Sequence, residues 1–262
     1  MMAAASSTAP SISGETLTAF LLRLADDHLV LGHRLSEWCG HAPMLEEDLA
    51  MPNMALDLIG QARALYQYAG EVEGKGRDED QIAYVRRERE YVNCLMAERQ
   101  NGDFAHTMLR QFYFAAFMQP LWQAMMTSTD ERLAGIAAKA EKEVAYHIRH
   151  AGEWVVRLGD GTEESTRRMK AAVEALAPYV DELFESDDVT RTVAGAGIAP
   201  DPSTLRPAFD AIVGPVFAEA GLEWVETPYG QTGGRQGRHG EALGFLLAEL
   251  QYMQRTYPGM IW

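Results

Sequence analysis

Hydrophobic positions recur at three- and four-residue steps along most of the chain, which is the period of a helix with one buried side. In the first such segment, which begins at Glu15, the residues Leu17, Leu21 and Leu24 follow this spacing, and Gly40 ends it. We expect further helices over residues 44–70, 81–99, 104–126, 130–158, 162–184, 203–221 and 241–257. No segment alternates as a β-strand does, so the pattern predicts an all-α bundle of about seven or eight helices in one domain.

The pattern also predicts where individual segments lie. Residues 104–126 are apolar nearly all round, which places that helix in the middle of the bundle. In segment 44–70 we expect one side to face the core, and its members are Leu45, Leu49, Leu56, Ile59 and Leu65. Residues 1–14 lack both the basic and the apolar part of a signal peptide, so we expect a disordered tail before a single helical domain of residues 15–262. Residues 185–202 and 229–240 are expected to be surface loops.

Charge excludes some classes of function. The chain has 23 Lys plus Arg against 38 Asp plus Glu, a net charge of −15, which disfavours binding to nucleic acid or to an anionic membrane surface. The longest apolar run, from Phe112 to Met118, is much shorter than the roughly 20 residues that cross a bilayer. Cys39 and Cys94 belong to no CxxC pair, so we expect neither a disulfide framework nor a zinc site. A cytoplasmic protein is the expectation.

Polar residues inside long helices raise the possibility of a di-iron carboxylate site. Such a site takes a Glu-x-x-His motif from each of two helices, because residues three apart share a helix face. The residues three positions before the seven histidines are Ala25, Val30, Trp38, Asp103, Val144, His147 and Gln236. The one acid, Asp103 before His106, stands at a predicted helix start, where capping explains it. The chain therefore contains no Glu-x-x-His.

Two pairs with a different spacing remain. Glu143 and His147 are four apart on segment 130–158, and Asp57 and Gln61 are four apart on segment 44–70. Together they predict a small polar cluster inside the bundle. A hydrogen-bonded network that fixes the helix register is our main interpretation, because buried polar groups must be paired. The alternative is an atypical iron site of Glu143, His147, Asp57 and a further acid, for which Asp27 and Glu37 are the candidates.

Other chemistry finds little support. No GxSxG, HExxH or phosphate-loop motif occurs. Cys39 and His41 are a candidate nucleophile pair, although a packed helix junction explains this segment better. The glycine-rich segment 232–239 concentrates positive charge at Arg235 and Arg238. It is either a flexible connector or a contact for an acidic partner or a phosphate.

The chain resembles the C subunits of the bacterial ring 1,2-phenylacetyl-CoA epoxidases, which are ferritin-like proteins of phenylacetate degradation. The resemblance covers about residues 16–262. It rests on Lys142-Glu143 with Tyr146-His147, and on residues 29–43, 53–63, 100–105, 157–162, 232–234 and 251–262.

The resemblance implies a ferritin-like four-helix-bundle core with additional helices. It also implies a structural, non-catalytic subunit of a monooxygenase that uses O2 and NADPH in aerobic phenylacetate catabolism. The catalytic A subunit would hold the di-iron centre, and this chain would have no catalytic, cofactor-binding or metal-binding residues. It would stabilise the A subunit, as a dimer of heterodimers, beside a small B subunit and a reductase. An all-round apolar helix such as 104–126 would offer surface to that partner.

Two alternatives stay open. One is a ferritin-like di-iron oxygenase or oxidase in its own right, with atypical ligands. The other is a homo-oligomeric interaction protein unrelated to oxygenation, which the resemblance alone disfavours. Association of the isolated chain with copies of itself also stays open.

Overall fold

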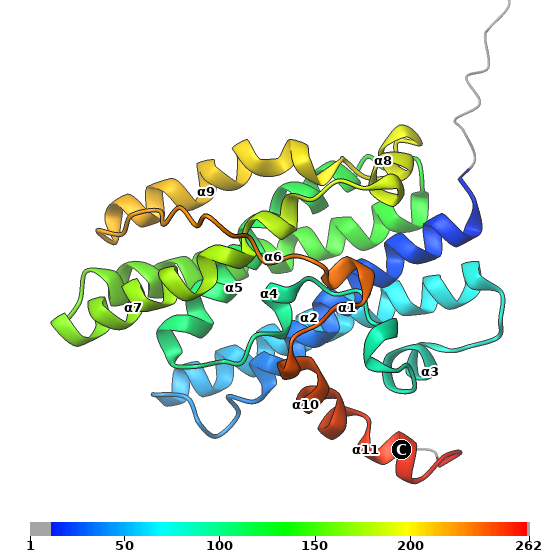
Figure 1. Cartoon of the computed structure of the whole chain (residues 1–262), viewed down its shortest axis with the longest axis horizontal. Coiled ribbons are helices and arrows are strands. Elements are labelled where there is room, and N and C mark those ends of the chain that lie inside the picture. The colour runs from blue at the N-terminus through cyan, green and yellow to red at the C-terminus, as the bar shows by residue number, and fades with distance from the viewer. Residues whose placement is uncertain (1–11, 261–262) are drawn as a thin grey trace, which may run out of the picture.

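A computed structural model describes residues 12–260, which form helices and contain no strand, so the all-α prediction is confirmed (Figure 1). The α-helices are α1 (Gly14–Ser36), α2 (Leu45–Glu73), α3 (Glu79–Tyr84), α4 (Leu95–Glu98), α5 (Phe104–Met125), α6 (Glu131–Gly159), α7 (Glu163–Leu176), α8 (Asp188–Gly195), α9 (Arg206–Glu219), α10 (Glu241–Leu250) and α11 (Tyr252–Thr256). Short 3-10 turns lie at Glu88–Glu90, Ala177–Tyr179, Asp181–Phe184, Pro202–Leu205 and Gly234–Gln236.

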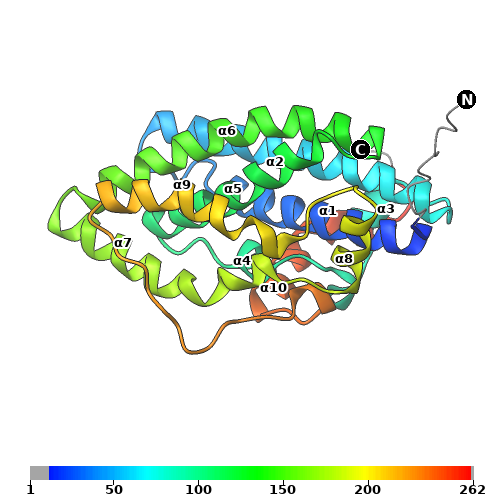
Figure 2. The ribbon, with the colours of Figure 1, turned by 90° about the horizontal axis from the view of Figure 1, so that it is seen from above.

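Four long helices form the ferritin-like core. Helix α1 packs along α2, and α5 packs along α6, as two hairpins, and α2 also contacts α6 (Figures 1 and 2). Side-chain caps set the starts of three of these helices: Ser13 accepts from Thr16, Asp103 from His106 and Asp130 from Leu133. Such caps satisfy backbone amides that have no partner within the helix. Asp103 therefore acts as the cap that its position suggested.

Helix α5 lies in the middle of the bundle, as its sequence predicted. Among its buried side chains Phe112, Tyr113 and Trp122 have no exposed surface. The other helices of this chain cover it up to its last turn, where Met126 is 46% exposed. The suggestion that residues 104–126 offer surface to a partner is therefore wrong for all but this last turn, because the all-round apolar character is used inside the chain.

The prediction of which side of α2 faces the core is wrong for the first half of this helix. Leu45, Leu49 and Leu56 are 69%, 60% and 66% exposed, whereas Leu65 is fully buried. The core side instead carries two methionines, two leucines and three alanines, namely Met51, Met54, Ala55, Leu58, Ala62, Leu65 and Ala69. The helix thus has two apolar sides, and the sequence pattern mixed residues of both. The second side lies outside the core.

Three further segments differ from the prediction. Residues 81–99 form α3, a 3-10 turn and α4 rather than one helix, because Arg86 turns inward to bind the buried Asp26. Segment 162–184 leaves the α-helical path after Leu176, with Pro178 in a 3-10 turn. The expected loop 185–202 contains α8, which Asp187 caps.

The expected N-terminal tail and the expected lack of a membrane span can be compared with the described residues. The expected tail of residues 1–14 lies largely outside the described residues, and Gly14 belongs to α1, because Ser13 caps that helix. Within residues 12–260, no helix combines the length and the apolar character that a membrane crossing requires.

Candidate functional site

The four residues of the expected polar cluster meet between α2 and α6. The Gln61 side-chain amide donates to the Glu143 carboxylate at 2.8 Å, and His147 Nε2 lies 3.1 Å from Asp57 Oδ2. Lys139, one turn before Glu143, places its Nζ 3.4 Å from that carboxylate. Because the two residues on each helix are four apart, the Asp57–His147 and Gln61–Glu143 contacts lie one helical turn apart.

A fifth residue, Gln111 of α5, extends this cluster into the core. Its Nε2 lies 3.2 Å from His147 Nδ1. An amide that donates to Nδ1 leaves the imidazole proton on Nε2, from which it is donated to Asp57. The side chain of His147 is 1% exposed, and those of Asp57 and Glu143 are 35% and 19% exposed. The cluster thus runs from the buried centre of the bundle to its surface.

His28 of α1 is a second buried polar group of the core. Its Nδ1 donates to the Leu24 carbonyl at 2.6 Å, and its ring lies against Phe114 and Trp122. Burial lowers the pKa of His28 to about 4, so the ring is neutral. The sequence pattern singles out neither His28 nor Gln111 as a site residue. Their roles become visible only from the residues of neighbouring helices that they contact.

The cluster is poor in metal ligands. Nowhere in residues 12–260 do three or more His, Cys, Asp or Glu side chains converge as a metal ion requires. The two further acids of the alternative iron site have other partners. Asp27 pairs with Arg235 at 2.8 Å and accepts from the Cys94 amide, and Glu37 pairs with Arg34 at 2.6 Å. The alternative ligand set is therefore not assembled.

The glycine-rich segment is packed onto α1. Both terminal nitrogens of Arg235 donate to Asp27, and the amides of Gly233 and Gly234 donate to Glu182 at 3.0 and 2.8 Å. A Cβ at Gly234 would lie 2.2 Å from the Asn93 carbonyl oxygen, so this close approach requires glycine. Arg235 is thus a structural ion-pair partner, and Arg238 alone of the two arginines is exposed.

The segment around Cys39 is a helix junction. Trp38 donates to Thr107 at 3.1 Å and packs edge to face against Phe104 at 5.8 Å. The ring of His41 contacts the Cys39 carbonyl oxygen, at 3.1 Å, and both residues are exposed. This contact uses the backbone of Cys39 rather than its thiol, and so provides no base for a nucleophile.

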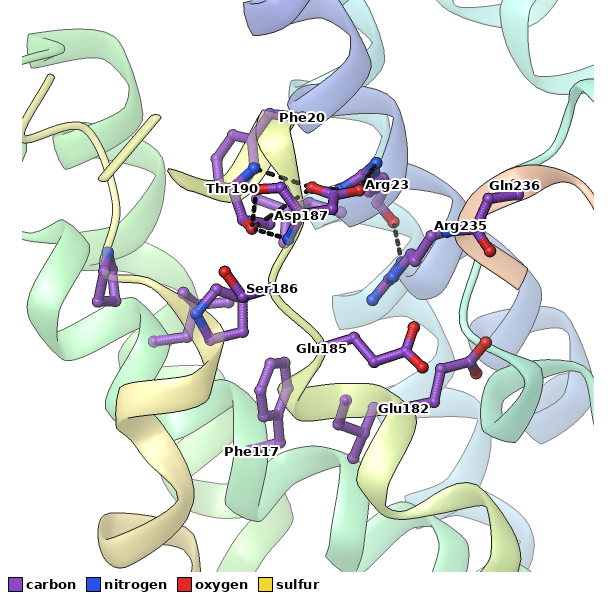
Figure 3. A pocket seen from close by; sticks show the side chains of 15 residues that line it. Phe20, Arg23, Phe117, Glu182, Glu185, Ser186, Asp187, Thr190, Arg235 and Gln236 are labelled. Atoms are coloured by element: carbon purple, nitrogen blue, oxygen red, sulfur yellow. Dashed lines mark hydrogen bonds and ion pairs between the residues drawn. The ribbon is translucent and has the colours of Figure 1, made fainter. Parts of the chain in front are cut away.

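A cavity of about 350 Å³ opens between α1, α5, α8 and the glycine-rich segment (Figure 3). Phe20 and Phe117 contribute apolar wall, and Arg23 pairs with Asp187 at 2.6 Å. Burial would raise the pKa of Asp187, but hydrogen bonds from Arg23 and the Thr190 amide lower it to about 2. Glu182 and Arg235, which also line the cavity, are engaged as described above. Each of these four charged side chains therefore already has a partner within the chain.

Comparison with known proteins adds the family. A family model described as "Phenylacetic acid catabolic protein" matches residues 1–262. The C subunit of the 1,2-phenylacetyl-CoA epoxidase of Escherichia coli (strain K12) is 47% identical over 246 residues, which cover 94% of this chain and 99% of that relative. Both matches extend over nearly the whole chain, including the polar cluster and the segments that pack around it. The chain therefore belongs to the phenylacetic acid catabolic protein family.

Proposed function

We propose that this chain is the structural, non-catalytic subunit of a 1,2-phenylacetyl-CoA epoxidase, a multicomponent monooxygenase of aerobic phenylacetate catabolism. It binds and stabilises the catalytic A subunit, which carries the di-iron centre, and itself holds no cofactor. The complex also contains a small B subunit and draws on O2 and NADPH. The relative from Escherichia coli, which is named as the C subunit of such an epoxidase, supports this assignment.

One observation carries the non-catalytic part of the proposal. His147, at the buried end of the cluster, contacts the amide of Gln111, and Glu143, nearer the surface, contacts the amide of Gln61. Amide side chains are neutral, whereas iron sites of helical bundles are built from carboxylates and imidazoles. The same two amides give Glu143 and His147 hydrogen-bond partners within the protein. The cluster is thereby suited to join α2, α5 and α6 in register.

Iron analysis of the chain purified alone from iron-supplemented cells tests the non-catalytic part. We expect only traces of iron, and we expect His147→Gln to lower stability without changing the iron content. A full di-iron complement on the isolated chain, lost in His147→Gln, together with O2-dependent turnover, would establish the oxygenase alternative instead.

Co-expression with the A subunit tests the partnership. We expect the two chains to elute together in equal amounts, with iron confined to the A subunit, and we expect each to resist urea better in the pair. Separate elution at micromolar concentrations would refute the partnership. Sedimentation of the isolated chain then shows whether it associates with copies of itself.

A further inference from the structure

An uncovered surface follows the seam between α2 and α6. It is formed by Leu49, Leu56 and Gly60 of α2 and by Lys139, Lys142 and Tyr146 of α6, and we call these six residues the α2–α6 face. Leu49 and Leu56 are 60% and 66% exposed, and Tyr146 is 37% exposed. In Figure 2, α2 and α6 run along one edge of the molecule, and no other helix of the described part of the chain lies outside them. Large apolar side chains gathered on one face mark an interaction site more often than scattered ones do.

The residues of this face are neighbours because the polar cluster joins their helices. Asp57 follows Leu56 and binds His147, which follows Tyr146. Glu143 binds both Gln61, next to Gly60, and Lys139. The partly exposed carboxylates of Asp57 and Glu143 thus lie at the bottom of the seam, between the apolar stripe of α2 and the exposed stripe of α6.

Two glycines of these helices have no explanation within the chain. Gly60 lies in the middle of α2 and Gly135 in the first part of α6, and both are exposed. A Cβ added at either position would meet no atom of residues 12–260 within 4 Å. Glycine inside a helix costs roughly 0.5–1 kcal/mol relative to alanine, so packing of this chain gives no reason to keep it. Close approach of another backbone would give one.

The charged side chains of α6 indicate the chemistry of the partner that would bind this face. The stripe of α6 at positions 139, 142, 146, 149 and 153 carries three exposed cations, Lys139, Lys142 and Arg149, and one exposed carboxylate, Glu153. It is thus net basic on a chain whose net charge is −15. A basic stripe beside an apolar stripe matches a partner helix with an apolar side flanked by carboxylates. A second copy of this chain would bring the same basic stripe and the same net charge, and repulsion opposes that pairing.

We propose that the α2–α6 face is the docking surface for the catalytic A subunit, which presents an apolar helix side flanked by acidic residues. This inference rests on the function proposed above and adds the location of the contact. Close backbone approach at Gly60, burial of Leu49 and Leu56, and ion pairs from Lys139 and Lys142 hold the two subunits together.

Affinity measurements with the A subunit test the location. We expect Leu56→Glu to weaken binding by at least about tenfold, because a carboxylate would be buried in an apolar contact. Lys142→Glu should weaken binding severalfold and mainly slow association, whereas Lys170→Glu, the same charge change on exposed α7, should have no effect. Gly60→Gln separates folding from docking: it should raise the melting temperature of the isolated chain and still weaken binding.

The outcomes distinguish the two proposals. If the unaltered chain does not bind the A subunit, the proposed function fails. If the unaltered chain binds, but Leu56→Glu, Lys142→Glu and Gly60→Gln bind equally well, only the docking surface is refuted. A concentration-dependent dimer of the isolated chain that Leu56→Glu dissociates, with binding of the A subunit unchanged, would assign this face to a second copy instead.

Discussion

Three histidines are held neutral by the fold. Burial lowers the pKa of His28, His33 and His106 from 6.5 to about 4 in each case. The unfolded chain takes up protons near pH 6.5, whereas the folded chain resists them until about pH 4. The unfolded state therefore binds more protons within this interval, and the free energy of unfolding falls as the pH falls through it. Above about pH 6.5 this contribution to stability is fully present.

Replacing His28 tests this dependence. We expect His28→Gln to reduce the loss of unfolding free energy between pH 7 and pH 4.5 by an amount on the order of 2 kcal/mol, because one shifted group is removed. The measurement is urea unfolding at a series of pH values. His41→Gln is the control, since His41 is exposed. Parallel pH profiles for the unaltered chain and His28→Gln would contradict the assignment.

The two arginines of the glycine-rich segment differ in their surroundings, and therefore in their expected effects. Arg235→Met leaves the fully buried Asp27 without its charged partner and should lower the free energy of unfolding by about 3–5 kcal/mol. Arg238→Met removes an exposed side chain and should change it by less than about 0.5 kcal/mol. Urea titrations of both variants at pH 7 measure the difference. Equal effects would mean that the Asp27 pair does not hold the segment.

At the scale of elements, glycines show which helix surfaces are packed within the chain. A Cβ at Gly159, where α6 ends, would lie 2.6 Å from the Ala220 carbonyl oxygen after α9, whereas Gly135 has free space. Gly159→Ala should therefore destabilise the chain by about 1–3 kcal/mol. Gly135→Ala should stabilise it by up to about 1 kcal/mol. Thermal unfolding compares the two, and a stabilising Gly159→Ala would refute the close contact.

Comparison of the expected and observed helices shows what the sequence can predict. Residues 130–158 have a single apolar period and capping residues, and the structure places α6 at Glu131–Gly159. Prediction failed where a distant partner decides: Arg86 breaks the expected helix 81–99 because Asp26 of α1 lies opposite. It failed on α2 because Leu49 and Leu56 have helical spacing whether they face the core or solvent.

The sequence also predicted only part of the polar cluster. Equal spacing on two helices indicated that Asp57, Gln61, Glu143 and His147 form one group, because spacing along a helix determines a shared face. Gln111 came from a third helix, and no feature of its own segment names its partner. A polar residue inside an all-round apolar helix is the signal that could have found it, since buried polar groups need partners.

Buried polar contacts tie the outer segments to the core of the whole molecule. Arg34 of α1 donates to the Ala242 carbonyl of α10 at 2.8 Å, and Gln251 donates to the Arg86 carbonyl at 2.9 Å. His239 contacts Glu98 at 2.7 Å, which raises the pKa of His239 despite its burial. These contacts fix the C-terminal segment to the bundle on elements other than the α2–α6 face, which leaves that face open.

Binding to this open face should therefore stabilise the whole molecule. With the A subunit at 100 times its dissociation constant, linkage predicts a gain of about 2.7 kcal/mol in the free energy of unfolding. Hydrogen exchange followed by mass spectrometry reads peptides of each chain separately and checks this. We expect slower global exchange in the core peptides of α5, and local protection confined to α2 and the middle of α6. For the Leu56→Glu variant, which we expect to bind at least about tenfold more weakly, the gain at the same concentration should fall to about 1.4 kcal/mol or less. Protection centred on α10 and α11 would instead place the contact at the C-terminal segment.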